Sequence, residues 1–150
     1  MNSKFDECVI MLVEDDEAHA DLTANALEQA NVGNKVLIMR NGSEALDYLK
    51  GMGQWKGKPD RAMPTLILMD LKMPQIDGKK ALAVIKGDEA LRHIPVVMLT
   101  SSILEEDVKE CYTLGANSYI VKPVSFGKFV ETIKSVPLYW LLVNKLPRGI

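Results

Sequence analysis

The stretch TLILMDLKMPQIDG, residues 65–78, decides how the chain folds. Its first five residues are uncharged and mostly apolar, which is typical of a short strand buried on both faces of a sheet. That strand runs directly into the carboxylate of Asp70, and Pro74 and the Asp77–Gly78 turn follow soon after. Because a buried strand does not normally end on a charge, the stretch predicts that other groups stabilise Asp70.

Outward from residues 65–69, apolar runs alternate with amphipathic segments through the whole sequence. The other strands are predicted at 8–13, 35–39, 94–100 and 117–121. Helices are predicted at 17–31, 41–52, 77–88, 104–116 and 125–136, and a loop at 51–64. Five strand–helix units in a row, with strands apolar on both faces, indicate an α/β fold in which helices cover both sides of a parallel sheet. A Rossmann-like and a flavodoxin-like strand order both remain open at this point.

Apolar spacing also predicts which helix faces turn inward. In the helix at 17–31, one row consists of Ala18, Leu22, Ala26 and Ala30. The next two helices are expected to bury Ala45, Leu46 and Leu49, and Leu82 and Ile85, respectively. Asn41 or Ser43 is the expected N-cap of the helix at 41–52, and Gly115 is expected to end the helix at 104–116.

The composition is that of an ordinary globular domain. The chain has 150 residues, of which 47% are hydrophobic and 25% charged, and its net charge is −2. Because it lacks a dense basic run, we expect no nucleic-acid binding. No signal peptide or membrane span is predicted, and Cys8 and Cys111 lack metal-site spacing, so we expect a cytoplasmic protein with reduced thiols. A single domain is predicted over 1–150, with a core at about 8–136 and an apolar C-terminal extension at 137–150.

Polar side chains occupy the ends of four predicted strands. In a parallel α/β sheet, ligands bind outside the carboxyl ends of the strands, so these residues are candidate site residues. They are Glu14, Asp15 and Asp16 after the first strand, Asp70 after the third, Thr100, Ser101 and Ser102 at the fourth, and Lys122 and Pro123 after the fifth. Each taken alone fits a helix cap or a solvated side chain, but their gathering at one edge of one sheet indicates a site.

This set of residues suits phosphoryl transfer. Clustered carboxylates raise each other's pKa unless a cation is present, and oxygen ligands favour Mg²⁺. Asp70 is then the nucleophile that forms an aspartyl phosphate. Lys122 supplies a positive charge to one phosphoryl oxygen, and the Thr100 hydroxyl donates to another. No GxGxxG or GxxxxGK[ST] motif follows the first strand, which argues against dinucleotide and P-loop sites.

Four motifs in this order resemble the receiver domain of two-component response regulators. They are VEDD at 13–16, LILMDLKMPQIDG at 66–78, VVMLTSS at 96–102 and YIVKP at 119–123. The resemblance extends over about residues 8–136. It implies a flavodoxin-like (βα)5 three-layer sandwich with strand order 2-1-3-4-5, in which the first and third strands lie side by side.

The resemblance implies a role for each residue that faces the phosphoryl group. Asp70 is implied to be the phosphoacceptor, and Lys122 to bind the phosphoryl group. Thr100 is implied to be the switch hydroxyl, whose movement lets Tyr119 turn inward. A cis peptide is implied before Pro123.

A metal site is implied beside the phosphoacceptor. Its Mg²⁺ ligands are implied to be the acidic pair Glu14 and Asp15, the carboxylate of Asp70, and the backbone carbonyl of Lys72. Asp16 is then a cap for the first helix. Lys72 departs from the related regulators, which often have Asn at this position, so the lifetime of the phosphorylated state is the property that this residue is expected to change.

Residues 51–64 and the apolar tail at 135–147 are similar to those of small stand-alone regulators that pair with bacterial and cyanobacterial phytochrome histidine kinases. The resemblance therefore implies a sensor histidine kinase as partner, with bacteriophytochromes among the candidates. Because the tail is more apolar than one helix face needs, we expect a homodimer formed by the fourth helix, the fifth strand, the fifth helix and this tail.

The sequence thus predicts a single-domain response regulator of a two-component phosphorelay, a signalling protein rather than an enzyme. It takes a phosphoryl group from a histidine kinase onto Asp70 and switches a protein-interaction surface. One alternative is an aspartyl-phosphate phosphohydrolase, but that class has a second Asp where this chain has Lys72. The other is a receiver-like binding module that is never phosphorylated. Such modules usually lack the acceptor Asp or the Lys, and this chain has both.

Overall fold

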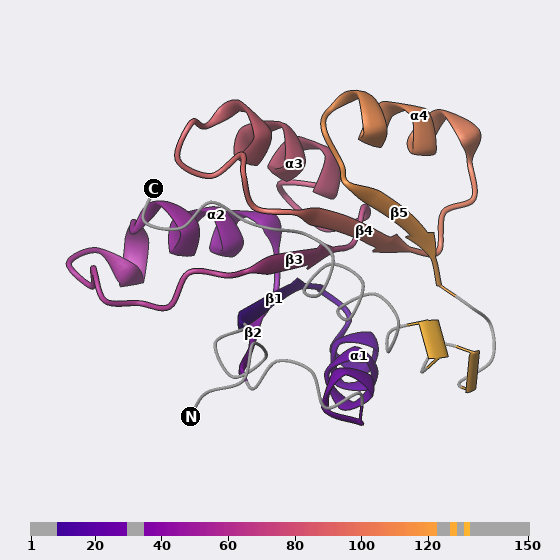
Figure 1. Cartoon of the computed structure of the whole chain (residues 1–150), viewed down its shortest axis with the longest axis horizontal. Helices are drawn as coiled ribbons and strands as arrows, with labels where there is room; N and C mark the ends of the chain where they lie inside the picture. Colours follow the sequence, from indigo (N-terminus) through magenta and orange to yellow (C-terminus); the bar gives the residue numbers. More distant parts are fainter. Residues whose placement is uncertain (1–8, 30–34, 123–126, 129–130, 133–150) are drawn as a thin grey trace.

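The computed structural model describes residues 9–29, 35–122, 127–128 and 131–132 (Figure 1). The strands are β1 (Val9–Val13), β2 (Lys35–Met39), β3 (Leu66–Met69), β4 (Val96–Thr100) and β5 (Ser118–Val121). The helices are α1 (Glu17–Gln29), α2 (Gly42–Lys50), α3 (Gly78–Gly87) and α4 (Glu105–Thr113), with a 3-10 turn η1 (Gly53–Trp55). Every predicted strand and the first four predicted helices are therefore present. Four predicted features lie outside the described residues: most of the helix at 125–136, the tail at 137–150, Cys8 and the peptide before Pro123.

The strands form one parallel sheet in the order β2-β1-β3-β4-β5. This order is flavodoxin-like, which excludes the Rossmann-like alternative. The chain leaves β1 toward one edge to form β2 and returns to the other side of β1 to form β3, so the order reverses between β1 and β3. α1 lies on one face of the sheet, and α2, α3 and α4 lie on the other (Figure 1). The carboxyl ends of β1 and β3 are where this topology places a ligand.

Burial on both faces explains the uninterrupted apolar runs of the central strands. β3 and β4 are buried throughout, and β1 is buried except at Val9. Met11 and Val13 point into the hydrophobic cluster on the α2–α4 side, whereas Ile10 and Leu12 point into the cluster on the α1 side. The ends of these strands are therefore anchored from both sides of the sheet.

The inward face predicted for α1 is partly wrong. Ala18 is exposed and Leu22 is only half-buried, while Ala30 lies outside the described residues. The buried residues of α1 are Ala20, Thr23, Ala26 and Leu27. A row of alanines carries little apolar surface, so the larger Leu27 determines how the helix is rotated against the sheet. The inward residues predicted for α2 and α3 are all buried, as expected.

The helix ends follow the predicted capping residues. Asn41 is the N-cap of α2, and its side chain accepts a hydrogen bond from the Glu44 backbone at 2.8 Å. Asp16 caps α1 in the same way, by accepting from the His19 backbone at 3.1 Å. Gly115 follows α4 with a φ of 108°, a conformation that glycine adopts without strain.

The segment predicted as a loop at 51–64 is more ordered than expected, because it contains η1 and is tied to the end of α2. Arg61 donates to the backbone carbonyls of Tyr48 at 2.6 Å and Leu49 at 3.1 Å. Trp55 packs edge-on against the Tyr48 ring, with 5.1 Å between the ring centroids. These contacts satisfy helix-end carbonyls that α2 itself leaves unpaired.

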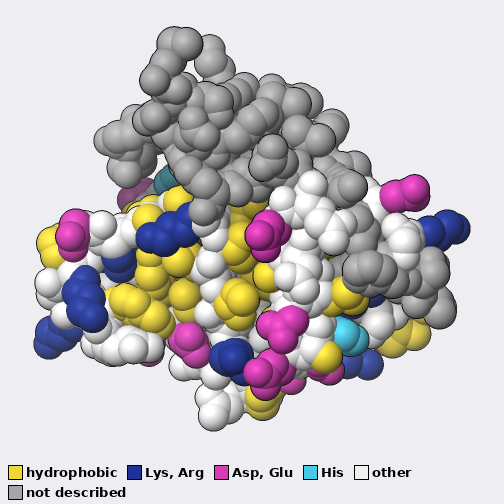
Figure 2. All heavy atoms as spheres, turned by 90° about the horizontal axis from the view of Figure 1, so that it is seen from below, with side chains coloured by type: hydrophobic (Ala, Val, Ile, Leu, Met, Phe, Trp, Pro, Cys, Tyr) yellow, Lys and Arg dark blue, Asp and Glu magenta, His cyan; other side chains and the backbone are white. Residues whose placement is uncertain are grey.

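Charged side chains are mixed on the face of the molecule that Figure 2 shows. Lys and Arg are interspersed there with Asp and Glu. Across the ranges that the structure describes, no helix has both the length and the apolarity needed to cross a membrane.

Candidate functional site

Three carboxylates meet where β1 and β3 end. Val13 pairs with Met69 across the two strands, so the residues that follow, Glu14 and Asp70, are neighbours. Each of Glu14, Asp15 and Asp70 offers a carboxylate oxygen, and the three oxygens all lie within 4.8 Å of one another. Glu14 is buried, Asp70 is half-buried and Asp15 is exposed. This graded exposure leaves the cluster open to solvent on one side.

Lys122 brings a positive charge into this cluster from the end of β5. Its Nζ lies 2.6 Å from Glu14 Oε1 and 3.5 Å from Asp70 Oδ2, and its side chain is only 8% exposed. Burial raises the pKa of Glu14 to about 7, against the hydrogen bond from Lys122 and with a smaller contribution from the charge of Asp70. The Lys122 ammonium therefore pairs with two of the three carboxylates, and the cluster keeps an excess of negative charge.

The backbone around Asp70 is held by the loop that leads to α3. The Asp70 amide donates to the Val13 carbonyl at 3.1 Å, and Asp70 Oδ1 accepts from the Leu71 amide at 2.7 Å. Gly78 donates to the Leu71 carbonyl at 2.7 Å, and a Cβ at Gly78 would lie 2.2 Å from the Asp70 carbonyl oxygen. The loop folds back so closely that only glycine fits at position 78. The direction of the Asp70 side chain is thereby fixed.

Thr100 ends β4 at the same edge of the sheet and is buried. Its hydroxyl oxygen accepts from the Ser102 amide at 3.4 Å. Tyr119, on the neighbouring β5, is half-buried and donates through its hydroxyl to the Ser102 carbonyl at 2.9 Å. The Tyr119 ring packs against the hydrophobic cluster on the α2–α4 side. The segment after β4 thus joins Thr100 to Tyr119.

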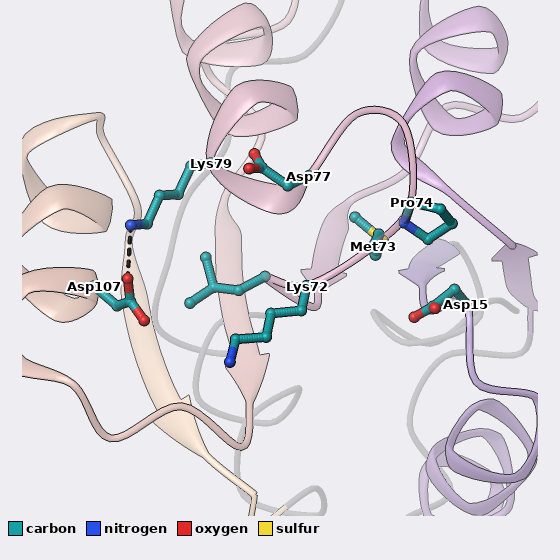
Figure 3. A pocket seen from close by; sticks show the side chains of 8 residues that line it. Asp15, Lys72, Met73, Pro74, Asp77, Lys79 and Asp107 are labelled. Atoms are coloured by element: carbon teal, nitrogen blue, oxygen red, sulfur yellow. Dashed lines mark ion pairs between the residues drawn. The ribbon is translucent and has the colours of Figure 1, made fainter.

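A polar network that the sequence did not indicate links this segment to α3. Ser102 Oγ donates to Asp107 Oδ2 at 2.5 Å, and Asp107 Oδ1 accepts from Lys79 Nζ at 2.6 Å (Figure 3). Lys79 also contacts Glu110 at 3.0 Å. The network was not predictable from the sequence, because acidic residues in the first turn of a helix are common and are explained by the helix dipole alone.

The Asp107 charge is expected to contribute to stability only above acid pH. The hydrogen bond from Lys79, and then that from Ser102, lower the pKa of Asp107. Such a group adds stability above its unfolded pKa of about 3.9, and the contribution is lost as the pH falls through the folded pKa. Asp107→Asn should therefore lower the free energy of unfolding at neutral pH, and the difference from wild type should shrink below about pH 4.

Urea unfolding at neutral and acid pH measures this difference. Glu110→Gln is the matched control, because Glu110 shares Lys79 but its side chain is 55% exposed, and exposed pairs contribute little. An Asp107→Asn effect of equal size at both pH values would contradict a role for the charge.

A cavity of about 460 Å³ opens beside the acidic cluster. It is lined by Asp15, Leu71, Lys72, Met73, Pro74, Asp77, Lys79 and Asp107 (Figure 3). Lys72 extends along this cavity from the loop after β3, and its ammonium group points away from Asp15 (Figure 3).

The donor set of the cluster fits a hard divalent cation. It offers only oxygen ligands, which Mg²⁺ prefers, and Mg²⁺ sites usually contain one or two carboxylates together with water and phosphate oxygens. The residual negative charge and the open side of the cluster, at Asp15, suit that coordination. An open parallel sheet of this order, with such a cluster at the reversal point, defines a flavodoxin-like α/β protein whose ligand site lies at the carboxyl ends of β1 and β3.

The chain matches the response regulator receiver domain over residues 10–134 and belongs to that family. It is 39% identical to the probable methanogenesis regulatory protein FilR2 of Methanothrix harundinacea, with 95% of this chain and 89% of FilR2 covered. It is 35% identical to response regulator Rcp1 of Synechocystis sp., with 93% of this chain and 92% of Rcp1 covered.

Solved structures show the same fold. The phosphorylated cyanobacterial phytochrome response regulator RcpA superposes with a TM-score of 0.86 at 38% identity, over 93% of this chain and 98% of RcpA. The Mn²⁺-bound form of Rcp1 superposes with a TM-score of 0.84 at 35% identity, over 93% of this chain and 99% of Rcp1. Receiver domains bind Mg²⁺ or Mn²⁺ at an acidic pocket, and this chain has an acidic cluster of Glu14, Asp15 and Asp70 that could hold such an ion.

Proposed function

We propose that Asp70 is the phosphoacceptor of this receiver domain and that a sensor histidine kinase is the donor. The observation that supports it is the convergence of Glu14, Asp15, Asp70 and Lys122, with Asp70 held by the backbone and partly exposed to solvent. A carboxylate oxygen of Asp70 attacks the phosphorus of a phosphohistidine. The P–O bond forms, the N–P bond breaks, and the imidazole of the kinase leaves with the electron pair of that bond.

The other residues of the set stabilise the phosphoryl group. When bound, Mg²⁺ offsets the negative charge of the phosphoryl oxygens, and we assign its binding to Glu14, Asp15, Asp70 and the backbone carbonyl of Lys72. Lys122 keeps its contact with the site and donates to one phosphoryl oxygen. Thr100 donates to another, and the movement of its hydroxyl is transmitted through Ser102 to Tyr119, which changes the surface around α4 and β5.

The proposal is tested by incubating the protein with acetyl phosphate or phosphoramidate and recording its intact mass. A single phosphoryl adduct that forms with Mg²⁺ and not with a chelator supports it. Turnover of phosphate monoesters would instead favour the phosphohydrolase alternative. A protein that takes up no phosphoryl group from either donor, or from a phosphorylated kinase, would be a binding module that is not phosphorylated.

The kinase that we propose is of the phytochrome type. The support is the similarity to RcpA and Rcp1, of which the first is a cyanobacterial phytochrome response regulator. The chain then works in the cytoplasm as a single receiver domain over 1–150, with its core at about 8–136 and the extension at 137–150. It is not an enzyme in its own right and catalyses only its own phosphorylation and dephosphorylation. Light-dependent phosphotransfer from a purified phytochrome kinase tests this assignment.

Lys72 is expected to set the lifetime of the phosphorylated state. Its long side chain lines the cavity beside the cluster, and we propose that an attacking water reaches the phosphoryl group through this cavity. Asparagine is shorter and opens that path, so Lys72→Asn should lose its phosphoryl group faster than wild type. Decay of the intact-mass adduct after removal of the donor measures the rate, and equal decay of the two proteins would contradict this role.

We also propose a homodimer formed by α4, β5, the helix predicted at 125–136 and the tail. Exposed apolar side chains on this side support it: Ile103, Leu104, Tyr112 and Val121. A variant that ends at Ser135 is expected to have about half the mass of the full chain by light scattering, because the apolar tail adds contact area. An unchanged mass would exclude the tail from the interface.

A further inference from the structure

A third group contacts the Lys122 ammonium besides the two carboxylates. His19 Nδ1 lies 3.2 Å from Lys122 Nζ, although the two residues are 103 positions apart in the chain. An ammonium has three protons and no lone pair, so it can only donate. His19 Nδ1 is therefore the acceptor, and the proton of the neutral imidazole resides on Nε2.

The position of His19 is set by elements on both sides of it. Asp16 caps α1 by accepting from the His19 amide, so the backbone of His19 is fixed in the first turn of that helix. α1 itself follows β1 directly, after the acidic pair. The side chain of His19 thus reaches Lys122 from the first turn of the helix that follows the acidic pair.

The three contacts of Lys122 differ in strength. The contact to Glu14 is short, at 2.6 Å, whereas that to Asp70 is long, at 3.5 Å. Glu14 alone would draw the ammonium toward itself and away from Asp70. An acceptor at His19 takes up another proton of the ammonium and limits its rotation, so that the third proton stays directed at Asp70.

We propose that His19 is a positioning residue for phosphoryl transfer, which keeps Lys122 directed at the reacting oxygen atoms of Asp70. This inference rests on the proposed function. His19 touches none of the three carboxylates of the metal cluster in the contacts that the structure describes, so its effect is on Lys122 and not on the affinity for the metal. When Lys122 turns from Asp70 to a phosphoryl oxygen, the contact with His19 is kept.

Two variants separate the acceptor atom from the bulk of the ring. His19→Phe keeps a ring of similar size and removes the acceptor, whereas His19→Asn places a carbonyl oxygen where Nδ1 was. With Mg²⁺ saturating, His19→Phe should be phosphorylated by acetyl phosphate about fivefold more slowly, because the Lys122 ammonium loses one hydrogen bond that holds it in place. His19→Asn should recover most of the rate, and calorimetric titration should give all three proteins the same Mg²⁺ affinity.

A double-mutant cycle with Lys122 shows whether the effect passes through the lysine. In a Lys122→Ala background, His19→Phe should cause no further slowing. An equal slowing in that background, a failure of Asn to recover the rate, or a wild-type rate for His19→Phe would each overturn the inference.

An NMR measurement makes the inference independent of phosphorylation. The chain has only two histidines, so His93 serves as the internal reference. The ¹⁵N shifts of His19 in alkaline solution should report the Nε2–H tautomer in wild type and a mixture of tautomers in Lys122→Ala. If these tautomers are observed but the protein takes up no phosphoryl group, the proposed function is refuted and the contact between His19 and Lys122 is still supported. A mixture of tautomers in wild type would refute the contact itself.

Discussion

Asp70→Asn is expected to abolish the phosphoryl adduct and, at the same time, to raise the melting temperature of the metal-free protein. An amide oxygen is not a nucleophile comparable to a carboxylate, so no acyl phosphate forms. The asparagine side chain is nearly isosteric and still accepts from the Leu71 amide, which is 2.7 Å from Asp70 Oδ1. The change removes one negative charge from a cluster of three carboxyl groups, whose charges repel one another when no cation separates them.

The size of the expected stabilisation is modest. Lys122 loses one long contact, so the net gain is about 1 kcal/mol, which shifts the melting temperature of a domain of this size by about 3 °C. Thermal unfolding in the presence of a chelator measures this shift. Mg²⁺ should narrow the difference in melting temperature between the variant and wild type, because wild type binds the ion better. A variant that melts lower than wild type would show that the carboxylates do not repel each other. An adduct on the variant would show that another residue accepts the phosphoryl group.

Gly78→Ala adds one methyl group, and we expect it to destabilise the protein more than a methyl group added anywhere else in the site. The new Cβ would lie 2.2 Å from the Asp70 carbonyl oxygen and 2.8 Å from Leu71 Cα. Both neighbours are backbone, which cannot move aside as a side chain can. Overpacking of this kind costs about 1–3 kcal/mol, and the shift of the Asp70 backbone should also slow phosphorylation.

Gly87→Ala is the matched control for that variant. Gly87 lies in the same helix, α3, and a Cβ there meets nothing within 4 Å. Its replacement should leave the phosphorylation rate unchanged and should be neutral or stabilising, by up to about 1 kcal/mol. Urea unfolding and the rate of adduct formation give both quantities for both variants. If the two variants had the same free energy of unfolding and the same rate of adduct formation, the close approach of the loop to Asp70 would affect neither stability nor phosphorylation.

The strands and most helices could be predicted from the sequence, whereas the order of the strands in the sheet could not be predicted from their apolar pattern. Strands such as β3 and β4 are apolar on both faces, so their pattern reveals a buried parallel sheet. The same pattern says nothing about which strand lies beside which, and the strand order therefore depended on the four motifs that resemble the receiver domain. The gathering of Glu14, Asp15, Asp70 and Lys122 was predictable because strand ends share one edge of the sheet.

Contacts that depend on helix rotation were not predictable. The expected inward row of α1 was partly wrong, because Leu27 rather than an alanine row sets its rotation. The position of His19 beside Lys122 follows from that rotation and has no signal in the sequence. Lys79 and Arg61 were also missed, since a single basic residue on a helix or in a loop reads as a solvated charge until its partners are known.

The most direct measurement of the central claim is chemical location of the phosphoryl group. After incubation with Mg²⁺ and acetyl phosphate, borohydride reduces an aspartyl phosphate to homoserine, and peptide mass spectrometry identifies the position. The account predicts homoserine at position 70, only when Mg²⁺ and the phosphodonor are both present. Aspartate that remains unreduced at position 70 in a phosphorylated protein, or homoserine at another position, would contradict it.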